Sequence, residues 1–144
     1  MAKRILVPMD RTGTAESVLS VVGDLARSSG GTVRLLHVAP VPEERVADDG
    51  RVVAYVSQEM ERIELNRLDY LRRAAECQLE DVPIESVVRF GSPVQEIVRE
   101  AEAFGADLIA VATSRRSRLG RALGSVADSV FRKAGVPVLL LGAR

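Results

Sequence analysis

The segment that decides the fold is GADLIAVATSRRSRLGRALGSVADSVFRKAGVPVLLLGAR, Gly105–Arg144. It contains two apolar runs, Asp107–Ala112 and Val136–Leu141, separated by a helical pattern over Ser125–Ala134. Short apolar runs of this kind are typical of strands that are buried on both faces of a parallel sheet. A loop rich in Arg, Ser and Gly, Thr113–Ser125, joins the first run to the helix. Parallel α/β sheets bind anions where a strand leads into a helix N-terminus, so the sequence predicts an anion-binding crevice here.

The same alternation of strand and helix extends back toward the start of the chain. Strands that alternate with helices pair in parallel through right-handed crossovers. We therefore predict an α/β fold: a doubly wound, five-stranded parallel sheet of strand order 3-2-1-4-5 with helices on both faces, in a single domain over residues 1–144. The upstream strands are predicted at Ile5–Met9, Thr32–Val38 and Ile84–Phe90.

Three helices are predicted upstream of Gly105. The first follows Thr12 or Thr14, either of which can serve as its N-cap. A long amphipathic helix is predicted from about Val52 to Leu79, and a third helix has Ser92 as its cap and Pro93 at its first position. The predicted inward positions of the first helix are Val18, Val21, Val22 and Leu25.

In the predicted strand order, the first and fourth strands lie side by side while their helices cover opposite faces. Such a switch point leaves a crevice beyond the carboxyl ends of the strands. Met9–Thr12 and Ala112–Ser125 are expected to form its two walls. His37 has no His, Cys or acidic partner at metal-ligand spacing, and we interpret it as a core or strand-end residue.

Composition narrows the function. The chain has no net charge and only 3% aromatic residues, so we expect no nucleic-acid partner, which calls for a basic surplus and stacking aromatics. No segment approaches the roughly 18 consecutive apolar residues of a membrane helix. The single Cys77 gives neither a disulfide framework nor a metal cluster. We therefore expect a cytoplasmic protein with no membrane partner.

The chain resembles the universal stress protein family over nearly its whole length. The resemblance is carried by the order and spacing of ILVPMD, LLHV, FGSPVQEIV, ADLIAVATSRR and LGSVADSVFRKAGVPVLLL. It implies an adenine nucleotide alpha hydrolase-like fold and a stress-response or regulatory binding module. The implied ligand is ATP or AMP, with Mg²⁺ present only together with the nucleotide.

The loop after the fourth strand departs from the family pattern. Members that bind ATP have Gly, two residues, Gly, nine residues, then Gly and Ser or Thr. Here Ala112 and Arg115 stand at the leading glycine positions, and only eight residues, 116–123, precede Gly124. Glycines let backbone N–H groups approach phosphate closely, whereas arginine reaches phosphate through its side chain from farther away. The resemblance implies a site made of Pro8, Met9, Asp10, Val38, Val111, Ala112, Arg115, Arg116, Gly124 and Ser125, with Asp10 toward ribose or adenine and the backbone of Val38 toward adenine.

Two interpretations stay open: a nucleotide-binding stress protein, and a stress protein that acts through protein contacts without nucleotide. The sequence contains no Ser/His/Asp arrangement, intact phosphate loop or carboxylate pair at a strand end, so it indicates at most slow ATP hydrolysis. A phosphoacceptor signalling domain would need clustered acids after the first strand and an aspartate ending the third. The chain has Asp10 alone after the first strand and Phe90–Gly91 after the third.

The last strand predicts an oligomer. Val138–Leu141 is apolar throughout and is placed by the fold at a sheet edge, where no Lys or Glu discourages pairing. Two-fold pairing of this edge with its copy satisfies the backbone and buries the leucines. The resemblance implies the same contact, so we predict a homodimer built on this strand.

Overall fold

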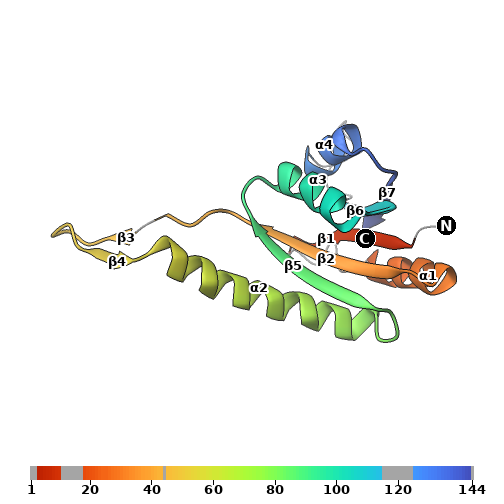
Figure 1. Ribbon diagram of the computed structural model, residues 1–144, viewed down its shortest axis with the longest axis horizontal. Coiled ribbons are helices and arrows are strands. Elements are labelled where there is room, and N and C mark those ends of the chain that lie inside the picture. The colour runs from red at the N-terminus through yellow and green to blue at the C-terminus, as the bar shows by residue number, and fades with distance from the viewer. Residues whose placement is uncertain (1–2, 11–17, 44, 115–124, 144) are drawn as a thin grey trace.

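The computed structural model describes residues 3–10, 18–43, 45–114 and 125–143. Within them, five parallel strands in the order β5-β2-β1-β6-β7 form the central sheet (Figure 1). Counted along the chain among the strands of this sheet, the order is 3-2-1-4-5, so the predicted fold class is confirmed. The strands are β1 (Arg4–Pro8), β2 (Thr32–Ala39), β5 (Ile84–Phe90), β6 (Leu108–Ser114) and β7 (Val138–Ala143).

Helices cover both faces of the sheet, as predicted (Figure 1). One face carries α1 (Leu19–Ser29) and α2 (Val56–Gln78), and the other carries α3 (Pro93–Phe104) and α4 (Ser125–Lys133). Because a sheet covered in this way has no solvated face at its centre, its central strands β1 and β6 contain continuous apolar runs instead of alternating ones.

The central strand β1 illustrates this burial. Ile5 and Val7 pack in the hydrophobic cluster beneath α1 and α2, whereas Leu6 between them packs beneath α3 and α4. All three side chains are completely buried. The unbroken apolar sequence of β1 is therefore required by the two layers of helix that enclose it.

The buried face of α1 differs from the prediction. Val21 and Leu25 were expected to point inward, but both are exposed. The reason is the close approach of α1 to the core: a Cβ at Gly23 would lie only 3.0 Å from Leu79 Cδ2, so a glycine belongs on the packed face. The buried positions of α1 are Leu19, Val22, Gly23, Ala26 and Ser29.

The start of the long helix was also predicted wrongly. The helix was predicted from about Val52, but Val52–Ala54 form a short strand, β4, which pairs antiparallel with β3 (Arg45–Val46). The helix α2 begins only at Val56. A turn closes this hairpin, with Gly50 at φ +86° donating its N–H to the Ala47 carbonyl at 2.9 Å. β-Branched valines directly after a turn favour a strand over a helix. The hairpin and the first turns of α2 project beyond the main sheet (Figure 1).

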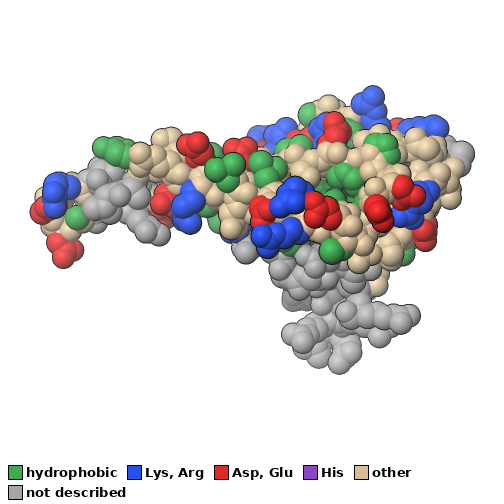
Figure 2. Space-filling view, turned by 90° about the horizontal axis from the view of Figure 1, so that it is seen from below, with side chains coloured by type: hydrophobic (Ala, Val, Ile, Leu, Met, Phe, Trp, Pro, Cys, Tyr) green, Lys and Arg blue, Asp and Glu red, His purple; other side chains and the backbone are tan. Residues whose placement is uncertain are grey.

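The outer surface of α2 carries charges of both signs. Arg72 pairs with Asp69 and Glu76, and Arg73 also pairs with Asp69. Figure 2 shows acidic and basic side chains interspersed over one face of the molecule, without a large patch of one sign. Exposed helix pairs of this kind contribute little stability each, so α2 is held by its buried residues, Leu71 and Ala74.

Gly105 provides a test of the backbone geometry that ends α3. It is the C-cap at φ +71°, a left-handed conformation that costs an L-residue about 1–2 kcal/mol. We expect Gly105→Ala to lower the free energy of unfolding by about that amount in urea denaturation. The control is Gly135→Ala, because Gly135 is not among the positive-φ glycines and a Cβ there meets no described atom within 4 Å. Equal losses in the two variants would contradict the argument.

Candidate functional site

A pocket of about 220 Å³ opens at the carboxyl ends of β1, β2 and β6. The first turns of α3 and α4, which cover the same face of the sheet, close it from the side. Its position is that of the predicted crevice between the first and fourth strands of the sheet. The lining residues are Pro8, Met9, Asp10, Leu36, His37, Val38, Pro93, Ile97, Val111, Ala112, Val126 and Ala127.

The structure brings six of the ten predicted site residues into this wall: Pro8, Met9, Asp10, Val38, Val111 and Ala112. Ser125 is the first residue of α4 and directly precedes Val126 of the lining. Arg115, Arg116 and Gly124 lie outside the described residues. The part these residues play in binding remains a prediction.

The sequence analysis did not assign the other lining residues to a site. Pro93 was predicted only as the first residue of a helix, and Leu36 and His37 only as members of a strand. Ile97 belongs to the apolar stripe of α3 and also packs in the core, so nothing in the sequence separates its core role from its place in the pocket wall. Val126 and Ala127 follow the Gly-Ser pair of the family pattern, which is the signal that could have placed them.

His37 fixes the geometry of the pocket floor. It is buried, as interpreted from the sequence, and its Nδ1 donates a hydrogen bond to the Met9 carbonyl at 2.8 Å. Because a carbonyl can only accept, Nδ1 must carry the proton. The backbone N–H of Met9 in turn donates to the Leu36 carbonyl at 2.7 Å. These two bonds hold the end of β1, and with it Asp10, against the end of β2.

The pocket combines an apolar interior with a polar rim. Leu36, Val38, Ile97 and Val111 belong to the hydrophobic cluster beneath α3 and α4, whereas the carboxylate of Asp10 is on an exposed residue. The N-termini of two helices add partial positive charge at the rim. A flat, apolar ring with polar substituents matches such a site.

Two details of the rim concern predicted caps and metals. Ser92 is the N-cap of α3 and Pro93 its first residue, as predicted, but among the described residues the Ser92 side chain forms no capping hydrogen bond. Pro93 instead removes one of the unsatisfied N–H groups at the helix start. In the part of the chain that the structure describes, no group of three or more His, Cys, Asp or Glu is arranged to hold a metal ion.

A doubly wound sheet of this order with a crevice at its switch point defines the class of adenine nucleotide alpha hydrolase-like α/β proteins. Residues 1–142 match the universal stress protein family, and the chain belongs to that family. A universal stress protein of Methanocaldococcus jannaschii is 29% identical over 154 residues, covering 98% of this chain and 95% of its own. Universal stress protein G of Escherichia coli O157:H7 is 30% identical over 147 residues, covering 98% and 99%.

Solved structures share the fold. The Methanocaldococcus jannaschii structure superposes with a TM-score of 0.76 at 28% identity, covering 99% of this chain and 96% of its own. A universal stress protein from Archaeoglobus fulgidus in complex with dAMP has a TM-score of 0.64 at 23% identity, with 96% of each chain covered. A universal stress protein in complex with cAMP has a TM-score of 0.66 at 18% identity, covering 98% and 97%. Among the described helices of the present chain, none is both long and apolar enough to span a membrane.

The hydrogen bond between His37 and Met9 gives the prediction of this section. His37→Leu leaves the Met9 carbonyl without this donor, and we expect the free energy of unfolding to fall by about 1–3 kcal/mol. His37→Asn keeps an amide N–H near the position of Nδ1 and should recover part of the loss. Chemical denaturation measures both. A leucine variant as stable as the unaltered protein would show that this bond does not secure the end of β1.

Proposed function

We propose that this protein is a cytoplasmic stress-response or regulatory module that binds an adenine nucleotide, AMP more tightly than ATP, in the pocket at the carboxyl ends of β1, β2 and β6. The observation that carries the proposal is the pocket itself: an apolar interior at the sheet's switch point with a carboxylate at its rim. The exposed, single Cys77 is in keeping with a reducing compartment.

The adenine ring would lie between the β2 and β6 sides of the pocket. Val38 and Val111 supply apolar contact there, and backbone groups at the ends of their strands supply hydrogen bonds to ring nitrogens. Asp10 at the rim would accept hydrogen bonds from ribose hydroxyls. The complexes of relatives with dAMP and cAMP support this class of ligand, since both are adenine nucleotides with a single phosphate.

The preference for AMP follows from the sequence of the loop. Arg115 and Ala112 replace the glycines that allow close backbone approach to a polyphosphate. Arg115, Arg116 and Ser125 retain donors that suit a single phosphate group. Magnesium would then be held only through the phosphates of a bound nucleotide. No catalytic role is assigned to any residue of the site.

The test is calorimetric titration with AMP, ATP and adenosine, with and without magnesium. We expect AMP to bind more tightly than ATP. Val38→Phe fills the pocket from β2 and should weaken AMP binding by about tenfold or more. Val88→Phe is the matched control, because Val88 is half-buried on the opposite face of the neighbouring β5, away from the pocket lining. If the unaltered protein binds none of the three ligands, the alternative of a stress protein acting through protein contacts alone is favoured.

We further propose that the protein is a homodimer paired through β7. This strand is at one edge of the sheet, and Val138–Leu141 are only partly buried. The Pro137 carbonyl accepts from Ile109 of β6 at 3.0 Å, and by the alternation of a strand the N–H groups of Val138 and Leu140 then point away from β6. Phe131 of α4, the helix that packs against β7, is 54% exposed and adds apolar surface for a partner copy.

Leu140→Pro removes one outward N–H while leaving the bonds toward β6 in place, and edge strands tolerate proline. We expect this variant to sediment as a folded monomer at concentrations where the unaltered protein is a dimer. The control is Val41→Lys, which changes an exposed apolar residue in the connection that leads out to the projecting hairpin. Loss of the dimer in Val41→Lys but not in Leu140→Pro would place the interface on that side of the molecule.

A further inference from the structure

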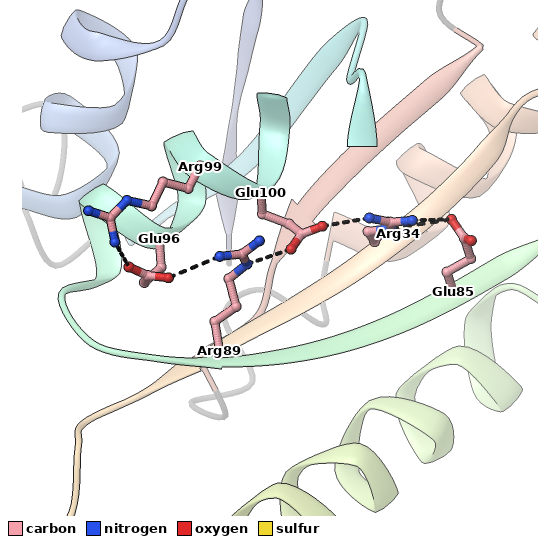
Figure 3. Close-up of polar contacts among 6 residues, drawn as sticks. All are labelled: Arg34, Glu85, Arg89, Glu96, Arg99 and Glu100. Carbon is pink, nitrogen blue, oxygen red and sulfur yellow. Dashed lines mark hydrogen bonds and ion pairs between the residues drawn. The ribbon is translucent and has the colours of Figure 1, made fainter. Parts of the chain in front are cut away.

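Six charged side chains form a continuous chain of ion pairs between α3 and the strands β2 and β5 (Figure 3). Acid and base alternate along it in the order Glu85, Arg34, Glu100, Arg89, Glu96, Arg99. Two of its contacts are short: Arg34 Nη1 lies 2.5 Å from Glu100 Oε2, and Arg89 Nε lies 2.6 Å from Glu100 Oε1. We call these six residues the α3 network.

The two glutamates of α3 at the centre of the network are buried. The side chains of Glu100 and Glu96 are 3% and 9% exposed, respectively. Each carboxylate receives a different arginine on each oxygen: Glu100 receives Arg34 and Arg89, and Glu96 receives Arg89 at 3.2 Å and Arg99 at 2.8 Å. Arg89 therefore bridges the two carboxylates, which lie one helical turn apart. Removal of one arginine would leave one oxygen of a buried carboxylate without its charged partner.

The ion pairs raise the pKa of the guanidinium groups of Arg34 and Arg89. The hydrogen bond to Glu100 is the main cause that raises the pKa of Arg89, with burial opposing it and Glu96 adding to it. For Arg34, burial alone lowers the pKa, but the hydrogen bonds to Glu100 and Glu85 outweigh that effect and the pKa is raised. Arg34 also lies over the Phe104 ring, 4.2 Å from its centroid.

The network reaches the wall of the ligand pocket. Glu96 directly precedes Ile97 and follows Pro93 by three residues, and these two neighbours line the pocket from α3. On the opposite side, Arg89 is the register partner of Val38, which lines the pocket from β2.

The turn that joins β5 to α3 closes directly on Glu96. Gly91 in this turn has φ +139°, and a Cβ on it would lie 3.4 Å from Glu96 Cγ. Arg89 in β5, before the turn, and Glu96 in α3, after it, form an ion pair that connects the two sides of the turn. Because the turn leads directly into Pro93, the position of the turn determines where the α3 wall of the pocket begins.

We propose that Glu96 and Glu100, acting through Arg89, are positioning residues that set the distance between the α3 wall and the β2 wall of the ligand pocket. This inference rests on the proposed nucleotide-binding function and assigns a control of affinity to residues outside the pocket. Directional hydrogen bonds fix the rotation and translation of α3 along the sheet, which apolar packing alone allows to slide. If α3 is free to shift on the sheet, ligand binding has to fix its position, and the free-energy cost of fixing it lowers the affinity.

The test uses Glu96→Gln, which keeps the size of the side chain but replaces one of the two acceptor oxygens with an NH2 group that cannot accept from an arginine. Hydrogen exchange is measured on the whole protein without nucleotide, and AMP affinity is measured by calorimetry. We expect faster exchange confined to residues 91–101, AMP binding weaker by about tenfold, and recovery of the protection at saturating AMP.

Glu76→Gln is the matched control, because it breaks a Glu–Arg pair on the exposed face of α2 and should change neither measurement. Arg99→Gln removes only the exposed outer arginine and should give a smaller effect in the same direction, so it replaces Glu96→Gln if that variant does not fold.

The outcomes separate the two proposals. Unchanged exchange over residues 91–101, or faster exchange with unchanged AMP affinity, would overturn the positioning role. Faster exchange spread evenly over the sheet would also overturn it, because the network would then be a general stabilising feature. Failure of the unaltered protein to bind AMP would instead overturn the proposed function, and the positioning of a nucleotide site would fall with it.

Discussion

The parallel pairing of β1 with β2 on one side and β6 on the other is the constraint on which the rest of this structure depends. The chain leaves β1 through α1, on one face of the sheet, and reaches β6 through α3, on the other face. The two connections therefore diverge at the carboxyl ends of neighbouring strands and leave a gap between them. Pro8, Met9 and Ala112 line the pocket because they are the residues at which these strands end. The site is thus a product of topology before any particular side chain contributes to it.

The two edge strands of the sheet, β5 and β7, differ in the charge of their side chains. At the β5 edge, Glu85 and Arg89 are tied into ion pairs with residues of β2 and α3, so a second strand pairing there would meet charged side chains held in place. At the β7 edge the corresponding residues are valine and leucine. Natural sheets use charge to discourage pairing at an edge, and the lack of charge leaves an edge available for a partner. This contrast is the structural support for pairing through β7 under the proposed homodimer.

Most of the fold could be predicted from the sequence because its signals are local. The central strand β1 is a short apolar run, and Ser92 and Pro93 mark the start of α3 as predicted. The errors concern information that a local pattern does not contain. The face of α1 depends on the room that Gly23 leaves for Leu79, which is 56 positions away in sequence (79 − 23). The hairpin before α2 was missed because its strands are too short to interrupt a helical periodicity that continues beyond them.

The α3 network was missed for the same reason, although one signal was present. Arg34 stands inside the apolar run TVRLLHV, and a charge in a strand that is covered on both faces needs a partner. Its partner Glu100 is 66 residues away, so the sequence indicates that Arg34 needs an acidic partner but does not identify which residue it is. For the pocket, the strand order predicted the residues at the strand ends, whereas Pro93 and Ile97 enter the wall only through the placement of α3 against the sheet.

Under the proposed function, the site separates recognition of the base from recognition of phosphate, and the two respond differently to sequence change. The pocket for a base is made by strand ends and core residues such as Leu36 and Ile97, so losing it would require losing part of the core. Recognition of phosphate depends on the residues of one loop, where glycine can be exchanged for arginine without disturbing the sheet. A member of the family can therefore lose the glycine pattern and still retain the crevice, as Arg115 and the intact pocket of this chain illustrate. Under the proposed function, such a change would shift the preference from polyphosphate toward monophosphate while leaving selection of the base to the sheet.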